Sequence, residues 1–207
     1  MQKKFPKKIK NKIIIGSLMV LITLGFFTYI KVLKYINNDI EMTSVIYYLD
    51  KINNKINNQH IEVNKKDNEK IIDYIGVLEI PKINLIRGIV AKNDIRNNVD
   101  YNIEILKEST MPNTYNSNLF LAAHSGNSKV SFFRYLYKLN YNDEVYVYYD
   151  NKKYIYKVSN LYEIEKNGYA EIKRNNNKKH LVLITCIDGT DKQLVIICDL
   201  IEESEDI

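Results

Sequence analysis

The sequence predicts a mainly β domain, a mostly antiparallel barrel or sandwich, which follows a membrane-spanning helix and a stalk. Three observations predict this organisation. Residues 13–30 contain no charged side chain, residues 31–70 are first helical in pattern and then polar, and from residue 71 onward short β-type runs follow one another without long helices between them. We therefore divide the chain into a basic tail (1–12), an anchor (13–30), a stalk (31–70) and a β domain (71–207).

Composition and charge limit the class of protein. A chain of 207 residues with 45% hydrophobic residues can form one ordinary core with an extension. The formal net charge is +5, but six lysines lie within the first twelve residues, so the remainder is close to neutral. Because a nucleic-acid-binding domain carries its positive charge on the folded body, this distribution argues against a nucleic-acid partner.

The uncharged run "IIIGSLMVLITLGFFTYI", residues 13–30, is long enough to cross a membrane, since eighteen helical residues extend about 27 Å. The preceding lysines place the N-terminus in the cytoplasm and the bulk of the chain outside the cell, in a single-pass topology. A cleaved secretory signal is an alternative, although "GFFTYIKVLKY" offers no small-x-small cleavage site. A buried core helix is a further alternative.

The stalk has two parts. "DIEMTSVIYYLDKINNKI" has apolar residues at a spacing that fits an amphipathic helix, whereas "NNQHIEVNKKDNEK", residues 57–70, is polar and lacks aromatic residues. The second part is typical of a loose tether.

Strand patterns dominate the β domain. The segments "YIGVLEIPKINLIRGIV", "SNLFLAAHSG", "DEVYVYYDNKKYIYKVSNLYEI", "KHLVLITC" and "KQLVIICDLI" are rich in β-formers. We expect a hairpin across Asp150 and Asn151. "KVSFFRYLYKL", residues 129–139, is the one segment of the domain whose apolar spacing predicts helical turns.

The chain has three histidines and two cysteines as candidates for chemistry. His60 lies in the polar tether, and His180 precedes Cys186 by six strand residues, about 20 Å, so it cannot pair with this thiol. His124 and Cys186 each follow an apolar strand run and could meet at one rim of a barrel as an imidazole–thiolate pair for nucleophilic catalysis. Alternatively, Cys186 is a small buried residue and His124 a loop residue, or Cys186 forms a disulfide with Cys198.

No set of residues has the spacing of a metal site, so we expect no metal.

Several segments, in order, resemble the sortases of Gram-positive bacteria. They are "YIGVLEIPKINL", "LFLAAHSG", "FFRYLYKLNYNDEVYVYY", "LVLITC" and "KQLVIICDLI", which together cover about residues 74–201. The resemblance implies an eight-stranded β-barrel with short helices and a cysteine transpeptidase that cleaves an LPxTG-like sorting signal through a thioacyl intermediate. It also implies transfer of the surface protein to an amine of the cell wall or of a pilin, with no nucleotide or redox cofactor, so we expect no cofactor.

The resemblance assigns roles to particular residues. His124 matches the family histidine, and Cys186 matches the nucleophile of the TLxTC motif, which reads "VLITC" here. Thr185 in this motif is expected to orient the cysteine loop and contact substrate. Ser125 is interpreted as a loop-capping residue.

One family residue is missing. Sortases place an arginine at the start of the strand after the cysteine loop, where this chain has Gln193 preceded by Lys192, and no arginine follows Arg174. Three outcomes stay open: Gln193 acts as a neutral oxyanion donor, Lys192 supplies the charge and contacts substrate, or the enzyme is slow or inactive. Lys192 requires a bulge or a loop position, because neighbouring strand residues face opposite sides. The alternative function is a sortase-like module that binds a peptide or the cell wall without catalysis.

Overall fold

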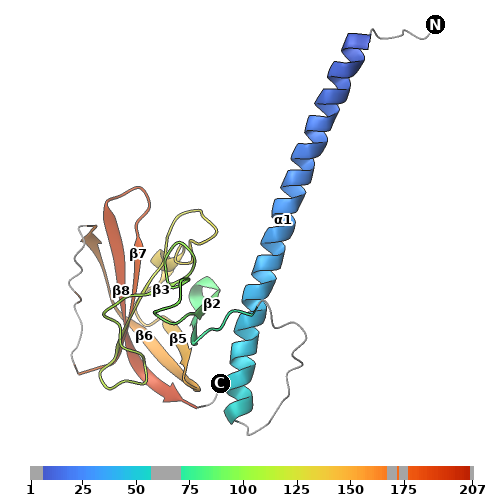
Figure 1. Cartoon of the computed structure of the whole chain (residues 1–207). Coiled ribbons are helices and arrows are strands. Elements are labelled where there is room, and N and C mark those ends of the chain that lie inside the picture. Colours follow the sequence, from blue (N-terminus) through green and yellow to red (C-terminus); the bar gives the residue numbers. More distant parts are fainter. Residues whose placement is uncertain (1–6, 57–70, 167–171, 173–176, 206–207) are drawn as a thin grey trace. The chain divides into compact units, whose positions relative to one another are not determined.

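The computed structural model describes residues 7–56, 71–166, 172 and 177–205. The chain divides into two compact units, Met1–Met42 and Thr43–Ile207, and helix α1 (Lys7–Ile56) contributes to both (Figure 1). The polar tether predicted at residues 57–70, with His60, lies outside the described residues.

Helix α1 contains a segment that is long and apolar enough to cross a membrane. This segment spans Gly16–Leu33, has a mean hydropathy of 1.8, and is not buried within the protein. It overlaps the anchor predicted at residues 13–30. No glycine or proline occurs between residues 26 and 56, and the helix accordingly continues without interruption into the first part of the predicted stalk.

The last turns of α1 belong to the same unit as the β domain. The Tyr48 hydroxyl donates to the Ile75 carbonyl oxygen at 2.6 Å, and the Ile72 amide donates to Ser44 Oγ at 2.9 Å. Val45 is buried in an apolar cluster on the outer side of β1 (Gly76–Ile80) and β5 (Glu144–Tyr149), with Tyr74, Val77, Val90 and Tyr148. The part of α1 that carries Ser44, Val45 and Tyr48 therefore packs against the β domain.

The domain is built on one eight-stranded sheet of order β2-β1-β5-β6-β8-β7-β4-β3. The remaining strands are β2 (Leu85–Ile89), β3 (Glu104–Ile105), β4 (Asn118–Ala122), β6 (Lys152–Glu165), β7 (His180–Cys186) and β8 (Lys192–Ser204). All strand pairings within this sheet are antiparallel except that of β4 with β7, which is parallel. The predicted mainly β, mostly antiparallel fold is confirmed.

The sheet curls into a nearly closed barrel around an apolar interior. Leu119 and Leu121 of β4 and Leu181 and Leu183 of β7 belong to this interior core. The side chain of Asn102, just before β3, donates to the Gly88 carbonyl oxygen of β2 and so links the two edge strands.

The opposite face of the strands carries a second apolar cluster, which we call the outer apolar face. Because strand residues alternate between faces, it takes the intervening positions of β7 and β8. It consists of Val182, Ile184, Val195 and Ile197, with Leu106, Phe120, Tyr162, Ile164 and Ile172 packed against them.

The predicted hairpin between β5 and β6 is confirmed. Tyr149 pairs with Lys152, and Asp150 and Asn151 have positive φ angles of 50° and 60°, as a two-residue type I′ turn requires. Asparagine and aspartate tolerate this backbone conformation better than other non-glycine residues.

The prediction of helical turns at residues 129–139 is confirmed in part, since the segment is not an α-helix. The segment forms turns that end in a short 3₁₀ helix, Leu136–Lys138. Its buried residues Phe133, Leu136 and Leu139 are three apart, which suits the 3₁₀ period of three residues per turn better than the α-helical period. The Phe133 amide also donates to the carbonyl oxygen of His124 at 3.0 Å, which attaches the segment to the end of β4.

Candidate active site

The parallel pairing of β4 and β7 brings His124 and Cys186 to the same edge of the sheet. Ala122 pairs with Ile184, and the Ala123 amide donates to the Ile184 carbonyl oxygen at 3.3 Å. Continuing this register by two residues places His124 opposite Cys186, the last residue of β7. Paired residues in adjacent strands lie on the same face of the sheet. His124 and Cys186 therefore lie on the side of the sheet that carries the outer apolar face, at the strand ends.

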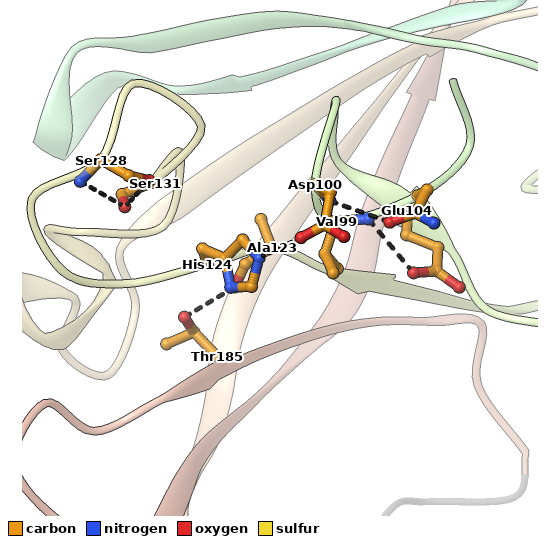
Figure 2. Close-up of polar contacts among 9 residues, drawn as sticks. Val99, Asp100, Glu104, Ala123, His124, Ser128, Ser131 and Thr185 are labelled. Atoms are coloured by element: carbon orange, nitrogen blue, oxygen red, sulfur yellow. Dashed lines mark hydrogen bonds and ion pairs between the residues drawn. The ribbon is translucent and has the colours of Figure 1, made fainter. Parts of the chain in front are cut away.

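Thr185 fixes the two strand ends to each other. Its side chain is buried, and its hydroxyl donates to the carbonyl oxygen of Ala123 at 2.8 Å, across 62 residues of sequence. Figure 2 shows Thr185 beside Ala123 and His124. The residues immediately before Cys186 and His124 are thus joined by a hydrogen bond, which sets the spacing of the two strand ends.

Gln193 is the cross-strand neighbour of Cys186. The two residues pair directly between β7 and β8, and the next pair toward the loop is hydrogen-bonded, with the Ile187 amide donating to the Lys192 carbonyl oxygen at 2.9 Å. Hydrogen-bonded and non-hydrogen-bonded pairs alternate in an antiparallel ladder, so Cys186 and Gln193 form a non-hydrogen-bonded pair, in which side chains approach most closely. Gln193 can therefore direct its amide toward a group bound at Cys186.

Lys192 lies on the other face of β8. Its Nζ is 2.9 Å from Glu163 Oε2, and this hydrogen bond raises the pKa of the lysine. The register irregularities between β6 and β8 occur at Ile155/Tyr156 and Val158/Asn160, away from the start of β8. The structure brings Gln193 together with Cys186 and leaves Lys192 paired with Glu163.

A second hydrogen bond joins the loops that follow His124 and Cys186. Ser125 Oγ donates to Asp188 Oδ1 at 2.7 Å. Gly126 lies against this carboxylate with a φ angle of +79°, a conformation that favours glycine. Its carbonyl oxygen accepts a hydrogen bond from Arg134 Nε. Ser125 and Arg134 thus hold the loop in place, in agreement with the capping role expected for Ser125.

His124 has a carboxylate partner that the sequence pattern does not reveal. Its Nε2 lies 3.1 Å from Asp100 Oδ1, in the segment before β3 (Figure 2). The exposed fractions of the two side chains are 42% and 73%. Asp100 lies in a polar segment, "AKNDIRNNVDYN", in which no motif distinguishes it from the neighbouring acidic and amide residues.

His180 and Cys198 lie away from this edge. His180 is fully buried at the start of β7, where its Nδ1 is 3.1 Å from Asp199 Oδ1. Cys198 pairs with Leu181, its thiol is free, and burial followed by the nearby Asp199 charge raises its pKa. Cys186 is also a free thiol, but it is partly exposed, so the two cysteines do not form the disulfide that the sequence left open.

Among the described residues, no group of three or more histidine, cysteine, aspartate or glutamate side chains is arranged to hold a metal ion.

A cysteine and a histidine at the ends of two parallel barrel strands, with a hydrogen-bond donor paired to the cysteine, define the class of site used in thiol-dependent acyl transfer. The family model of the sortase domain matches residues 78–201, more than half of the chain. The chain belongs to the sortase family.

Solved sortase structures share the fold. Sortase C of Streptococcus pneumoniae matches with a TM-score of 0.58 and 20% identity, over 67% of this chain and 74% of that chain. A lid mutant of sortase A from Corynebacterium diphtheriae gives 0.56 and 18%, over 67% and 76%. Sortase A of Listeria monocytogenes gives 0.53 and 19%, over 63% and 89%. No curated protein sequence gives a significant match.

Proposed function

We propose that this chain is a membrane-anchored cysteine transpeptidase that cleaves an LPxTG-like sorting signal and transfers the surface protein to an amine of the cell wall or of a pilin. The proposal rests on one observation above all: the register of β4 with β7 and of β7 with β8 assembles His124, Cys186 and Gln193 at one edge of one face. Family membership supports the same class of reaction.

The proposed reaction is an exchange of acyl bonds. The Cys186 thiolate attacks the carbonyl carbon of the scissile peptide bond, and the protonated His124 ring gives its proton to the departing amine as the C–N bond breaks. The acyl group is then held as a thioester on Cys186. An incoming primary amine attacks this thioester, His124 removes a proton from the amine, and the thiolate of Cys186 leaves.

Gln193 is proposed to stabilise the oxyanion of both tetrahedral intermediates. Its side-chain amide can donate a hydrogen bond but carries no charge, and charge-assisted hydrogen bonds are about twice as strong as neutral ones. The outer apolar face beside Cys186 offers a surface for the apolar residues of a peptide. The N-terminal helix, with Gly16–Leu33 in the membrane and the basic residues in the cytoplasm, is proposed to hold the domain outside the cell.

The experiment that tests this function uses the full chain in detergent micelles. It is incubated with a library of sorting peptides and an amine, and the ligated products are identified by mass. We expect a ligated product and a thioacyl adduct on Cys186, both lost in Cys186→Ala. Hydrolysed peptide without ligation would identify a hydrolase instead of a transpeptidase.

The specific alternative is a sortase-like module that binds a peptide or the cell wall without catalysis, and the glutamine at the family arginine position favours it. Binding of a sorting peptide with no adduct on Cys186 for any member of the library would support this alternative and overturn the catalytic proposal.

A further inference from the structure

We propose that Asp100 is a positioning residue for His124, so that the site operates with a carboxylate–imidazole–thiol arrangement. The inference deepens the proposed function and rests on His124 acting on Cys186. The observation that carries it is the distance of 3.1 Å between His124 Nε2 and Asp100 Oδ1.

The contact assigns separate tasks to the two ring nitrogens. When Nε2–H donates to the Asp100 carboxylate, Nδ1 is the nitrogen that exchanges a proton with Cys186 or with the leaving amine. In known triads the acidic residue holds the imidazole in the productive tautomer and orientation and stabilises the imidazolium, without taking up the proton itself. Asp100 is placed to do the same for His124.

The charge balance of the site increases the contribution that Asp100 makes by stabilising the His124 imidazolium. Cys186, His124 and Gln193 are the three residues that the strand ends bring together, and of these only His124 can become positively charged. Where the family arginine would supply a fixed cation, this site has a neutral amide. The thiolate–imidazolium pair forms when the proton of the Cys186 thiol moves to the His124 ring. A carboxylate that stabilises the imidazolium therefore stabilises this pair as well.

Asp100 sits in a turn that is held firmly. Its backbone amide donates to Asn98 Oδ1 at 2.9 Å, and the Asn102 amide donates to the Asn98 carbonyl oxygen at 2.8 Å. The Asn102 side chain is buried, where it donates to the Gly88 carbonyl oxygen and accepts from Arg87 Nε, both at 2.9 Å. The turn is therefore anchored to β2 through buried hydrogen bonds although the Asp100 carboxylate itself is exposed.

Arg87 also contacts the segment that is hydrogen-bonded to the backbone of His124. Arg87 is only 8% exposed, and its guanidinium carbon lies 4.0 Å from the centroid of the Phe132 ring. The next residue, Phe133, donates its amide to the His124 carbonyl oxygen at 3.0 Å. Arg87 thus connects the turn that carries Asp100 with the segment bonded to the His124 backbone, which limits relative movement of carboxylate and ring.

The test measures the rate at which iodoacetamide alkylates Cys186 in the full chain in detergent micelles at neutral pH. Removing an exposed carboxylate partner in Asp100→Ala is expected to slow the reaction by about twofold to fivefold. Because the carboxylate is exposed, added formate can enter the vacated position, and we expect it to restore most of the rate. Asp100→Asn, which keeps the size but not the charge, is expected to be slowed without rescue.

Asp94→Ala is the matched control, since Asp94 lies in the same segment and binds Arg96 through hydrogen bonds of 2.6 to 2.9 Å without contacting His124. We expect its alkylation rate to equal that of the wild type. An unchanged rate in Asp100→Ala, or a slowing that formate does not reverse in this variant, would overturn the proposal, as would equal slowing in Asp94→Ala.

Alkylation requires no sorting peptide, so the outcome is independent of the proposed function. A chain that ligates no peptide but shows formate-dependent alkylation in Asp100→Ala would reject the transpeptidase and keep the positioning role. Equal rates of peptide ligation with and without Asp100 would reject the positioning role and keep the transpeptidase.

Discussion

Cys186 and Gln193 form a directly opposed, non-hydrogen-bonded pair across β7 and β8, on the face that also carries Val195 and Ile197. Their side chains are closest neighbours in such a pair. The resemblance to sortases predicts an arginine at this position, where this chain has a neutral hydrogen-bond donor.

Replacing Gln193 tests whether this donor acts on the oxyanion. Loss of one oxyanion donor lowers kcat by about 10²-fold in well-studied enzymes, and we expect a decrease of this order in Gln193→Ala. Gln193→Arg is expected to raise kcat by about fivefold to tenfold, because a charge-assisted hydrogen bond replaces a neutral one. Steady-state peptide ligation by the full chain measures both effects. Lys192→Ala is the matched control on the opposite face, and full activity in Gln193→Ala would refute the assignment.

The two thiols should react very differently. Cys186 is partly exposed, whereas Cys198 is fully buried and its pKa is raised by burial, so it stays a neutral thiol at ordinary pH. We expect a single alkylation in the native chain, at Cys186, and a second only after unfolding. Peptide mapping by mass spectrometry after timed alkylation measures this, and equal labelling of both cysteines in the native state would contradict it.

Most strands could be predicted from the sequence because their β-formers are continuous or alternate, and the hairpin could be predicted from Asp150 and Asn151. The parallel pairing of β4 with β7 could not. It joins segments 62 residues apart, as the bond from Thr185 to Ala123 shows, and no local pattern encodes such a register. That pairing brings His124 opposite Cys186, so their proximity could be predicted only as a hypothesis about two strand ends.

Asp100 could not be identified from the sequence for a related reason. Its contact with His124 depends on a turn that Asn98 and Asn102 form and that Arg87 anchors. The sequence pattern of a strand does not indicate that an arginine within it is buried, as Arg87 is. The type of helical turn at residues 129–139 could not be predicted for a different reason, because apolar residues at positions 133, 136 and 139 fit a period of three as well as one of 3.6.

The hydrogen bond from Ser125 to Asp188 is expected to support activity by holding the two active-site loops together. Ser125→Ala removes it, and since the bond is exposed on a loop surface, we expect a loss of about twofold to fivefold in kcat. Hydrogen exchange of residues 187–191 should become faster in this variant. Asp191→Asn, in the same loop but without this bond, is the control. An unchanged kcat together with unchanged exchange of residues 187–191 in Ser125→Ala would contradict this role.

Asp199 should make the stability of the domain depend on pH. Burial alone would raise its pKa, but hydrogen bonds from Lys178 and Ser159 outweigh burial and lower it. A lowered folded pKa means that the contribution is complete above about pH 4, the ordinary aspartate value, and is lost as the pH falls through the lower folded value.

Asp199→Asn is therefore expected to reduce the free energy of unfolding by about 1–2 kcal/mol at pH 7, with the difference from the wild type shrinking as the pH falls below about 4. Urea unfolding of the full chain in micelles at pH 7 and at pH 3 measures this change. A difference that stays constant between the two pH values would show that the charge of Asp199 is not the source of the effect.

The packed end of α1 is expected to stabilise the β domain. A chain that begins at residue 43 keeps the buried Val45 and Ile52 and the hydrogen bond from Tyr48 to Ile75, whereas a chain that begins at residue 71 loses them. Burial of these side chains predicts a difference of about 2–4 kcal/mol in the free energy of unfolding. Within the longer chain, Tyr48→Phe should cost about 1 kcal/mol, because it deletes one hydrogen bond and keeps the ring. Tyr47→Phe is the matched control on the same helix, and equal stability of the two truncated chains would show that residues 43–56 act only as a spacer.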